Sequence, residues 1–247
     1  MARAKPLPRV YLAGEIPAHG VAPVPPEQSH HLAHVLRLTA GDAVVAFDGR
    51  GHEYAATIER ISKGGVTLVL GEPQAVDRES PFEVMLAQGI SSGERMDYTV
   101  QKAVELGVHA IQPLTAERSV VRLDRERAAK RVAHWQAVAA AACEQCGRNY
   151  VPEVRPVLAV EPWLGALPAA AARLTLAPEA TERLTQLERP DGPVILLAGP
   201  EGGFSPREKE NAEAAGFTAV RLGPRVLRTE TAAVAALAAM QALWGDF

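Results

Sequence analysis

Two glycine-containing loops hold the residues most suited to chemistry. One is Gly-Pro-Glu-Gly-Gly at residues 199–203, and the other spans residues 222–231 and carries Arg225, Arg228 and Glu230. The first loop lacks both the Gly-Lys-Ser/Thr ending of a P-loop and the spacing of a dinucleotide fingerprint, so phosphate is not its expected ligand. A carboxylate and an exposed backbone in such a loop suit a nucleoside-like cofactor. An ordinary glycine turn is the alternative, and the pairing of two such loops with nearby arginines makes it less favoured.

The elements that must position these loops follow an α/β pattern. The apolar run at residues 194–198 is typical of a buried parallel strand, and Ser205 with Glu208 forms a capping box that opens a helix. Ligands bind beyond the carboxyl ends of the strands in an open sheet, so a mainly parallel sheet with helices on both faces would bring both loops to one pocket. After residue 81, strands are expected at 82–90, 109–114, 153–157, 173–177, 193–198 and 219–222, and helices at 94–106, 123–143 and 231–244.

Residues 1–72 follow a different pattern, in which short apolar runs are separated by glycine turns. This alternation predicts a small antiparallel β-barrel, joined to the α/β domain by the polar, proline-bounded segment 72–81. A helix over residues 28–37, with Ser29 as its expected cap, interrupts the strands. The strands are expected at residues 9–12, 42–48, 53–58 and 65–70.

Two groups of residues raise the question of a metal or redox site. Three histidines share the predicted first helix, but no carboxylate or cysteine at ligand spacing joins them, so a helix face that leaves His31 and Arg37 free to contact phosphate groups is favoured. Cys143 and Cys146 form a Cys-x-x-Cys without a second ligand pair, which favours a structural role. No bound metal is therefore expected.

The composition, 47% hydrophobic and 22% charged over 247 residues, is that of a soluble globular protein with one large or two modest domains. The net charge of −3 gives no sign of a polyanionic partner, yet 21 of the 26 basic residues are arginine, which suits contacts to phosphates and bases. Genomic base composition explains that excess equally well. No apolar run approaches the roughly 18 residues of a membrane span, and residues 1–10 lack a signal-peptide core, so a cytoplasmic protein is expected.

The closing helix at residues 231–244 is rich in alanine, so its neighbours can approach it closely. A dimer interface is the preferred interpretation of its bulkier face, and packing within the chain is nearly as well supported. That face would consist of Val234, Leu237, Met240, Gln241 and Trp244.

Several segments together resemble the signatures of the SPOUT-class RNA methyltransferases. They are most similar to the bacterial RsmE family, whose members methylate N3 of a uridine in the 16S ribosomal RNA of the small subunit. The resemblance covers essentially the whole chain in order, which makes it more specific than either glycine loop alone. The matching segments are residues 31–37, 101–108, 117–120, 144–149, 197–205 and 222–232.

The resemblance implies a PUA-like β-barrel at residues 1–72 that helps to bind RNA, and a SPOUT methyltransferase domain at residues 73–247. The second domain would thread into a deep trefoil knot, bind S-adenosyl-L-methionine (SAM) in the knotted loops and form a homodimer. The knot follows from the resemblance alone, because knots are nearly absent from proteins. By the same resemblance, the cofactor would contact Leu176, Ala177, Ala198, Gly199, Pro200, Glu201, Gly202, Leu222, Gly223, Val226, Leu227 and Thr229.

Methyl transfer to N3 of uridine requires the N3 proton to leave and the charge on O2 and O4 to be stabilised. Arg225 or Arg228 would supply a cation beside the cofactor, and Glu230 would either take the proton or, the favoured role, orient an arginine. N3 lies on the Watson–Crick edge, so the target must be unpaired or extruded. The candidate RNA contacts are Arg9, His31, Arg37, Arg118, Arg122 and Arg148, although for each arginine alone a solvated surface role is favoured.

Two other functions remain open from the sequence. An RNA-binding module that has lost catalysis would share the fold, but the intact glycine and arginine loops argue against it. A nucleotide-dependent oxidoreductase would need a dinucleotide fingerprint, which this sequence lacks.

Overall fold

The computed structural model describes residues 6–14, 16 and 20–247 of the chain. These residues divide into two compact units, each with its own hydrophobic core. Unit 1 comprises the residues up to 79 together with 143–151, and unit 2 comprises residues 80–142 and 152–247. The predicted domains were residues 1–72 and 73–247, so segment 143–151, which belongs to unit 1, was expected in the second domain.

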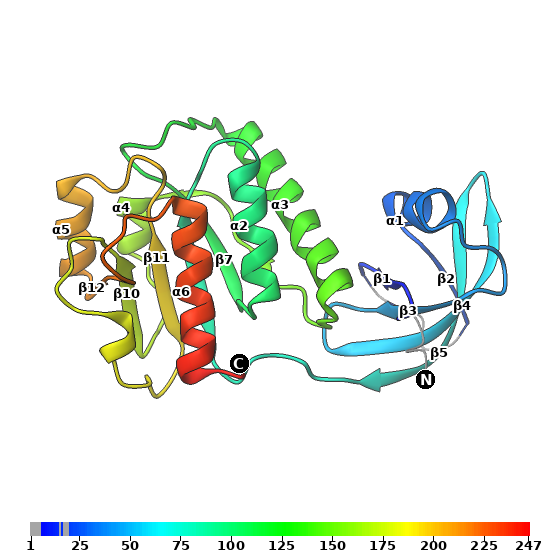
Figure 1. Cartoon of the computed structure of the whole chain (residues 1–247). Helices are drawn as coiled ribbons and strands as arrows, with labels where there is room; N and C mark the ends of the chain where they lie inside the picture. The colour runs from blue at the N-terminus through cyan, green and yellow to red at the C-terminus, as the bar shows by residue number, and fades with distance from the viewer. Residues whose placement is uncertain (1–5, 15, 17–19) are drawn as a thin grey trace. The chain divides into compact units, whose positions relative to one another are not determined.

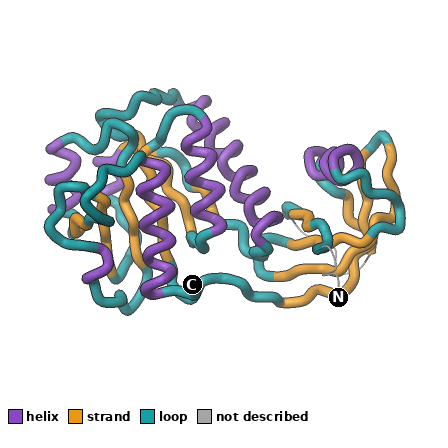
Figure 2. Tube along the Cα trace, viewed as in Figure 1, coloured by secondary structure: helices purple, strands orange, loops and turns teal. Residues whose placement is uncertain are grey.

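Unit 1 contains a five-stranded mixed sheet (Figures 1 and 2). Its strands are β1 (Arg9–Tyr11), β2 (Gly20–Pro23), β3 (Ala43–Phe47), β4 (His52–Ser62) and β5 (Gly65–Ala75). The order is β1-β3-β4-β5-β2, and β1 pairs with β3 in parallel while the other pairs are antiparallel. The expectation of a purely antiparallel barrel is therefore corrected, because the long connection between β1 and β3 lets the chain enter both strands in the same direction.

The helix of unit 1 is shorter and less regular than expected. α1 (Pro26–His30) passes directly into a turn of π-helix, η1 (His31–Val35). The prediction that Ser29 caps this helix is wrong, because Ser29 lies inside α1 and is buried. Its hydroxyl donates to the carbonyl of Val24 and accepts from the backbone N–H of Val66, both at 3.0 Å. Ser29 thus ties the helix to β5.

Unit 2 is built on a seven-stranded sheet (Figure 1). Its strands are β6 (Val84–Gly89), β7 (Ala110–Thr115), β8 (Glu153–Val154), β9 (Leu158–Ala159), β10 (Ala172–Leu176), β11 (Val194–Ala198) and β12 (Thr218–Val220). The order is β12-β10-β11-β6-β7-β8, with β9 also beside β7, and every pairing is parallel. The predicted mainly parallel sheet is confirmed.

Helices cover the sheet of unit 2. They are α2 (Glu94–Glu105), α3 (Arg125–Cys146, whose last residues belong to unit 1), α4 (Val160–Leu164), the 3-10 turn η2 (Leu184–Gln186), α5 (Pro206–Ala214) and α6 (Thr229–Trp244). Ile195 and Leu197 of β11 share a core with Trp163 of α4 and Ala212 of α5. Residues that alternate with them face the other side of the sheet. There α6 contacts both β11 and α2, and Figure 1 shows α6 and α2 side by side.

The bulkier face of α6 packs inside unit 2. Leu237, Met240 and Trp244 are buried. Gln241 is buried as well, and its Nε2 donates a hydrogen bond to the carbonyl of Leu106 at 2.9 Å. Packing within the chain therefore accounts for these four residues, whereas Val234, the fifth residue of the predicted face, is half-buried.

Among the residues that the structure describes, no helix is long and apolar enough to cross a membrane. The same residues include no group of three or more His, Cys, Asp or Glu side chains that could hold a metal ion. Cys143 is buried in unit 1, and this burial raises the pKa of its thiol to about 12. A thiol with so high a pKa stays protonated and is a poor nucleophile, so the surroundings of Cys143 favour the structural interpretation.

Candidate cofactor and RNA site

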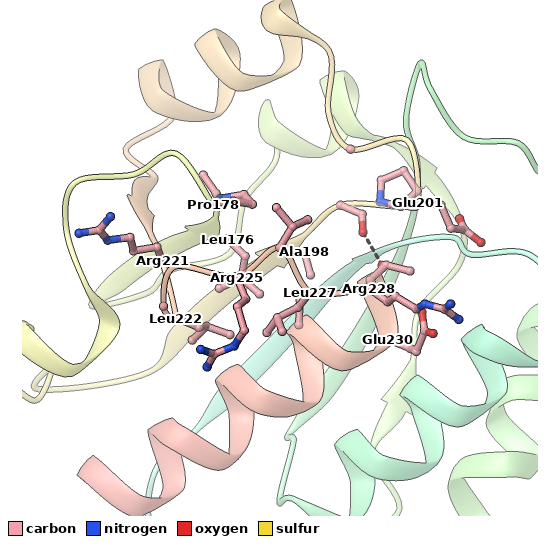
Figure 3. A pocket seen from close by; sticks show the side chains of 18 of the residues that line it. Leu176, Pro178, Ala198, Glu201, Arg221, Leu222, Arg225, Leu227, Arg228 and Glu230 are labelled. Atoms are coloured by element: carbon pink, nitrogen blue, oxygen red, sulfur yellow. Dashed lines mark hydrogen bonds between the residues drawn. The ribbon is translucent and has the colours of Figure 1, made fainter.

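Three neighbouring strands of unit 2 end at the same edge of the sheet. β10, β11 and β12 end at Leu176, Ala198 and Val220, and the loops that follow them enclose a cavity of about 590 Å³ (Figure 3). This volume lies within the roughly 300–1,000 Å³ of small-molecule sites. The predicted site residues that line the cavity are Leu176, Ala177, Ala198, Gly199, Pro200, Glu201, Leu222, Gly223, Arg225, Val226, Leu227, Arg228, Thr229 and Glu230. The prediction missed Arg95, Pro178, Gly203, Val220, Arg221 and Ala232, which also line it.

Hydrogen bonds join the two glycine loops directly. The hydroxyl of Thr229, at the start of α6, donates to the carbonyl of Gly199 at 2.6 Å. The same hydroxyl accepts from Nε2 of Gln88 at 3.1 Å. Gln88 is fully buried near the end of β6, and the prediction missed it. A lone amide in an otherwise apolar strand was the available signal, because a buried polar side chain needs partners.

Close backbone approaches hold residues 199–203 in place from two sides. A Cβ atom added at Gly89 would lie 2.5 Å from the nitrogen of Pro200, and one added at Gly202 would lie 2.7 Å from the carbonyl oxygen of Arg118. Any larger residue at either glycine would displace a neighbouring backbone. Gly202, predicted to contact the cofactor, does not line the cavity and instead lets the loop pack against Arg118.

The carboxylate of Glu201 anchors the first loop to the start of α2. Its Oε1 accepts hydrogen bonds from the backbone N–H and the hydroxyl of Ser92, both at 2.8 Å, and from Arg95 at 2.9 Å. Partial burial raises the pKa of Glu201, but these hydrogen bonds outweigh it and leave the pKa below its usual value. One oxygen of this carboxylate is therefore already engaged, whereas the sequence suggested a carboxylate available to a ligand.

The second loop brings two arginines and a carboxylate to the cavity. Arg225 and Arg228 are exposed, and neither has a side-chain hydrogen bond or ion pair with any residue that the structure describes. Figure 3 shows their side chains pointing in different directions, with Arg228 at the same end of the cavity as Glu230. The Oε2 atom of Glu230 is buried and has no donor within the described chain. No ion pair joins Glu230 to either arginine, so the favoured role of orienting an arginine is not seen.

Comparison with known proteins decides the family. Residues 78–241 match the model of the RNA methyltransferase domain, and residues 24–71 match that of the RNA methyltransferase PUA domain. The ribosomal RNA small subunit methyltransferase E of Buchnera aphidicola subsp. Schizaphis graminum is 33% identical over 242 residues, 98% of each chain. The chain belongs to the ribosomal RNA small subunit methyltransferase E family. The methyltransferase E of Bacillus subtilis is also 33% identical, over 87% of each chain.

Solved structures of similar proteins share the fold of this methyltransferase E family member. The Neisseria gonorrhoeae methyltransferase E bound to S-adenosyl methionine is 41% identical, with a TM-score of 0.89 over 98% of this chain and 99% of that chain. A Legionella pneumophila protein in complex with SAM is 40% identical, with a TM-score of 0.93 over the same shares. The family resemblance read from the sequence is confirmed.

Four of the six predicted RNA contacts of this methyltransferase E family member lie on the surface. His31 and Arg37 are exposed on unit 1, and Arg118 and Arg122 are exposed on unit 2. Arg37 has a φ of 57°, in the left-handed region, which costs an arginine about 1–2 kcal/mol. A residue keeps such a backbone conformation where the surrounding structure or a function requires it. The φ of Arg37 is therefore consistent with a functional role for this residue.

The other two predicted RNA contacts, Arg9 and Arg148, are held inside unit 1. Arg148 is only 5% exposed and pairs with Glu79. Arg9 donates to Glu53 at 2.9 Å, and its guanidinium lies 4.7 Å from the centre of the Phe47 ring. Both guanidinium groups are therefore engaged with protein partners. These surroundings favour a structural role for both arginines over the predicted RNA contacts.

Glu53 is the centre of this network in unit 1. It accepts hydrogen bonds from Arg78 and Arg9, both at 2.9 Å, and from Asn149 at 3.2 Å. The hydrogen bond from Arg78 is the main cause that lowers the pKa of Glu53 to about 2, against the opposing effect of burial. Arg9 also donates to the carbonyl of Arg148 at 3.2 Å. The network thus holds segment 143–151 against the sheet of unit 1.

Proposed function

We propose that this chain transfers a methyl group from SAM to N3 of a uridine in 16S ribosomal RNA. The observation that carries the proposal is the cavity of unit 2, where the hydrogen bond between Thr229 and Gly199 joins two loops and where Arg225 and Arg228 are unpartnered among the described residues. The relatives support it, because they are named ribosomal RNA small subunit methyltransferases or were solved with SAM.

The residues around the cavity fit SAM. Leu176, Leu222 and Leu227 supply apolar walls that suit an adenine ring, and the glycine loops expose backbone donors and acceptors to the ligand. When bound, SAM supplies an electrophilic methyl group on a sulfonium sulfur. The protein therefore has to position the target base, balance its charge and receive its proton.

Arg228 is the cation that addresses the target base in this proposal. Loss of the N3 proton leaves negative charge on O2 and O4 of the uracil ring, and a guanidinium can stabilise it by donating hydrogen bonds. Arg228 lines the cavity, and its side chain donates no hydrogen bond to any described residue. Its N–H groups are therefore available for this role. Arg225 reaches the cavity from a different direction and is the alternative cation.

Glu230 is the group that accepts the N3 proton. Its Oε2 atom is buried beside the cavity without a donor from the described residues, so a lone pair is available to a substrate N–H. The absence of an ion pair with Arg225 or Arg228 favours this role over that of orienting an arginine. N3 lies on the Watson–Crick edge, so the uridine must be unpaired or turned out of its helix to reach Glu230.

A trefoil knot is part of the proposal for unit 2. The N–H of Arg221 donates to the carbonyl of Glu182 at 2.9 Å, and the N–H of Leu184 donates to the carbonyl of Arg221 at 3.1 Å. Eight residues later, Thr229 is bonded to Gly199. The segment between them is thus bracketed by two earlier loops, which supports threading. Mechanical stretching of the two ends should leave a tightened knot, and a fully extended contour length would refute it.

A cytoplasmic homodimer is proposed from the family resemblance. Light scattering during size-exclusion chromatography should give twice the chain mass of 26.3 kDa. A mass of one chain at micromolar concentration would refute the dimer. Fractionation of cells should place the protein with the soluble, ribosome-containing fraction, and recovery with membranes would refute the location.

Methyl transfer separates this proposal from its alternative, an RNA-binding module of the same fold without activity. The full chain is incubated with SAM labelled in its methyl group and with 16S ribosomal RNA, either free or in small subunits. Label in the RNA, at one uridine, is the expected result. Tight binding of the same RNA without any transferred label would favour the binding module.

A further inference from the structure

A cluster of basic residues lies on unit 2, outside the cavity, between the end of β7 and the second turn of α3. Residues 117–131 contain six basic residues against three acidic ones, a local net charge of +3 in a chain whose net charge is −3. All six basic side chains are exposed. We call this surface the α3 basic track, and its cations are Arg118, Arg122, Arg125, Arg127, Lys130 and Arg131.

The acidic neighbours neutralise this track only in part. Arg127 lies 3.4 Å from Asp124 and Lys130 lies 2.7 Å from Glu126, but all four side chains are more than half exposed, and such pairs contribute about 0–1 kcal/mol. The remaining four cations of the track have no ion pair with any described residue. Cations in the first turn of a helix are also disfavoured by its dipole, so local stability does not explain this cluster.

Two adjoining clefts are lined in part by residues of the α3 basic track. One, of about 520 Å³, lies between residues 115–123, α4 and α5. The other, of about 340 Å³, is lined by Arg127, Lys130 and Arg131. Arg122 and its neighbour Leu123 line both clefts, so the two are contiguous at Arg122.

The track begins against the cofactor loop. The carbonyl of Arg118 packs on Gly202, where an added Cβ would lie 2.7 Å away. The preceding N–H, of Glu117, donates to Oε1 of Glu208 at 2.8 Å, and Oε2 of Glu208 accepts from the N–H of Ser205 at 2.8 Å. The capping carboxylate of α5 therefore fixes the start of the track beside the loop that borders the cavity.

We propose that the α3 basic track binds the sugar–phosphate backbone of the substrate RNA and carries the strand to the cofactor cavity. This inference rests on the proposed function. Five of the six cations are arginine, whose planar fork matches phosphate oxygens, and exposed arginines along a groove bind a backbone without reading its sequence. Because the α3 basic track lies beside the cofactor loop, the polyanion that it binds is the substrate RNA rather than an acidic protein. Unit 2 thus binds RNA by itself, in addition to any contribution from unit 1.

The substitution Arg131→Glu in the full chain tests the track, with Arg189→Glu as the matched control. Arg189 is exposed, makes the same charge change, and lies in the loop before β11, at the opposite edge of the sheet from the cavity. The affinity for a 16S ribosomal RNA transcript is measured over a series of salt concentrations, together with the affinity for SAM and the kinetics of methyl transfer.

Arg131→Glu should weaken RNA binding about tenfold, reduce the slope of log affinity against log salt by about 1, and raise KM for RNA with little change in kcat or SAM affinity. Arg189→Glu should match the wild type. An affinity and salt slope unchanged by Arg131→Glu would overturn the track, as would an Arg131-dependent affinity for polyglutamate without one for RNA. Failure of the wild type to transfer methyl groups would instead refute the proposed function, because RNA binding is measured separately.

Discussion

The hydroxyl of Thr229 donates a hydrogen bond to the carbonyl of Gly199 at 2.6 Å, across a separation of 30 residues in the chain. This one contact joins the two loops that line the cavity of unit 2. Gln88 of β6 also donates to this hydroxyl, at 3.1 Å. The geometry of the cavity therefore depends on a buried hydroxyl that both gives and receives a hydrogen bond.

Replacing Thr229 by valine should weaken SAM binding while the fold persists. Valine keeps the shape of threonine but removes the hydroxyl, so Gln88 Nε2 keeps only its hydrogen bonds to the carbonyls of Gly89, at 3.0 Å, and Gly199, at 3.4 Å. The loss of the two stronger bonds at Thr229 should cost about 1–3 kcal/mol. The loss of these hydrogen bonds should loosen the two loops. The affinity of the protein for SAM, measured by calorimetry, should therefore fall about fivefold to a hundredfold.

Thr231→Val is the control, because Thr231 is exposed two residues further along α6. It should bind SAM as the wild type does. Equal SAM affinity for Thr229→Val and Thr231→Val would show that the bond between Thr229 and Gly199 does not shape the site.

Replacing Arg228 by alanine should abolish methyl transfer. The side chain is exposed at the cavity and bonds to no described residue, so its loss should leave the unfolding temperature within a degree or two of the wild type. A loss of at least a hundredfold in kcat is expected for a group that stabilises developing charge. Labelled-methyl transfer measures it, and wild-type turnover by the variant would remove Arg228 from the mechanism.

Replacing Glu230 by glutamine should lower kcat and leave SAM affinity nearly unchanged. The amide has a similar shape but cannot take the N3 proton, and general-base groups contribute about a hundredfold to ten-thousandfold. Raising the pH should restore part of the rate of the variant, because hydroxide then removes the proton from N3. A variant with the wild-type rate and pH profile would assign the proton to another acceptor.

Replacing Glu53 by glutamine should change how the stability of unit 1 depends on pH. The pKa of Glu53 falls from its usual 4.5 to about 2 on folding. A lowered pKa means that its contribution is fully present above pH 4.5 and is lost as the pH falls toward 2. At pH 7 the variant should be less stable by about 1–2 kcal/mol, a value that allows for solvent screening at the half-exposed Arg78.

Urea unfolding at pH 7 and pH 3 measures this effect, and Glu59→Gln on the exposed side of β4 is the matched control. The difference between wild type and Glu53→Gln should shrink at pH 3, while Glu59→Gln should follow the wild type at both values. An equal difference at pH 7 and pH 3 would show that the Glu53 carboxylate is not the source of the stability.

Local sequence patterns predict much of unit 2 because its strands are buried on both faces and its helix ends carry their own signals. The run 194–198 appears as β11, and Ser205 with Glu208 forms the predicted capping box at α5. Once both loops are known to follow parallel strands, the edge of the sheet brings them together, which is why residues 30 apart could be paired from the sequence.

Local sequence patterns do not identify contacts between residues that are far apart in the chain. Arg9 and Arg148 were predicted to be surface arginines, yet they lie in one network although their positions in the chain differ by 139. No feature of the sequence near either arginine identifies the carboxylate with which it pairs. The return of segment 143–151 to unit 1 has the same cause, and β2 (Gly20–Pro23) was missed because it is short and ends in proline.

The most direct test of the account is to map methylated uridines in small-subunit ribosomal RNA. Methylation of N3 blocks Watson–Crick pairing, so reverse transcription stops at the modified nucleotide, and mass spectrometry of the digested RNA identifies 3-methyluridine. Cells that lack this protein should lose one such nucleotide from 16S ribosomal RNA, and the wild-type chain should restore it where Arg228→Ala does not. An unchanged content of 3-methyluridine at every position in cells without the protein would contradict the proposed function.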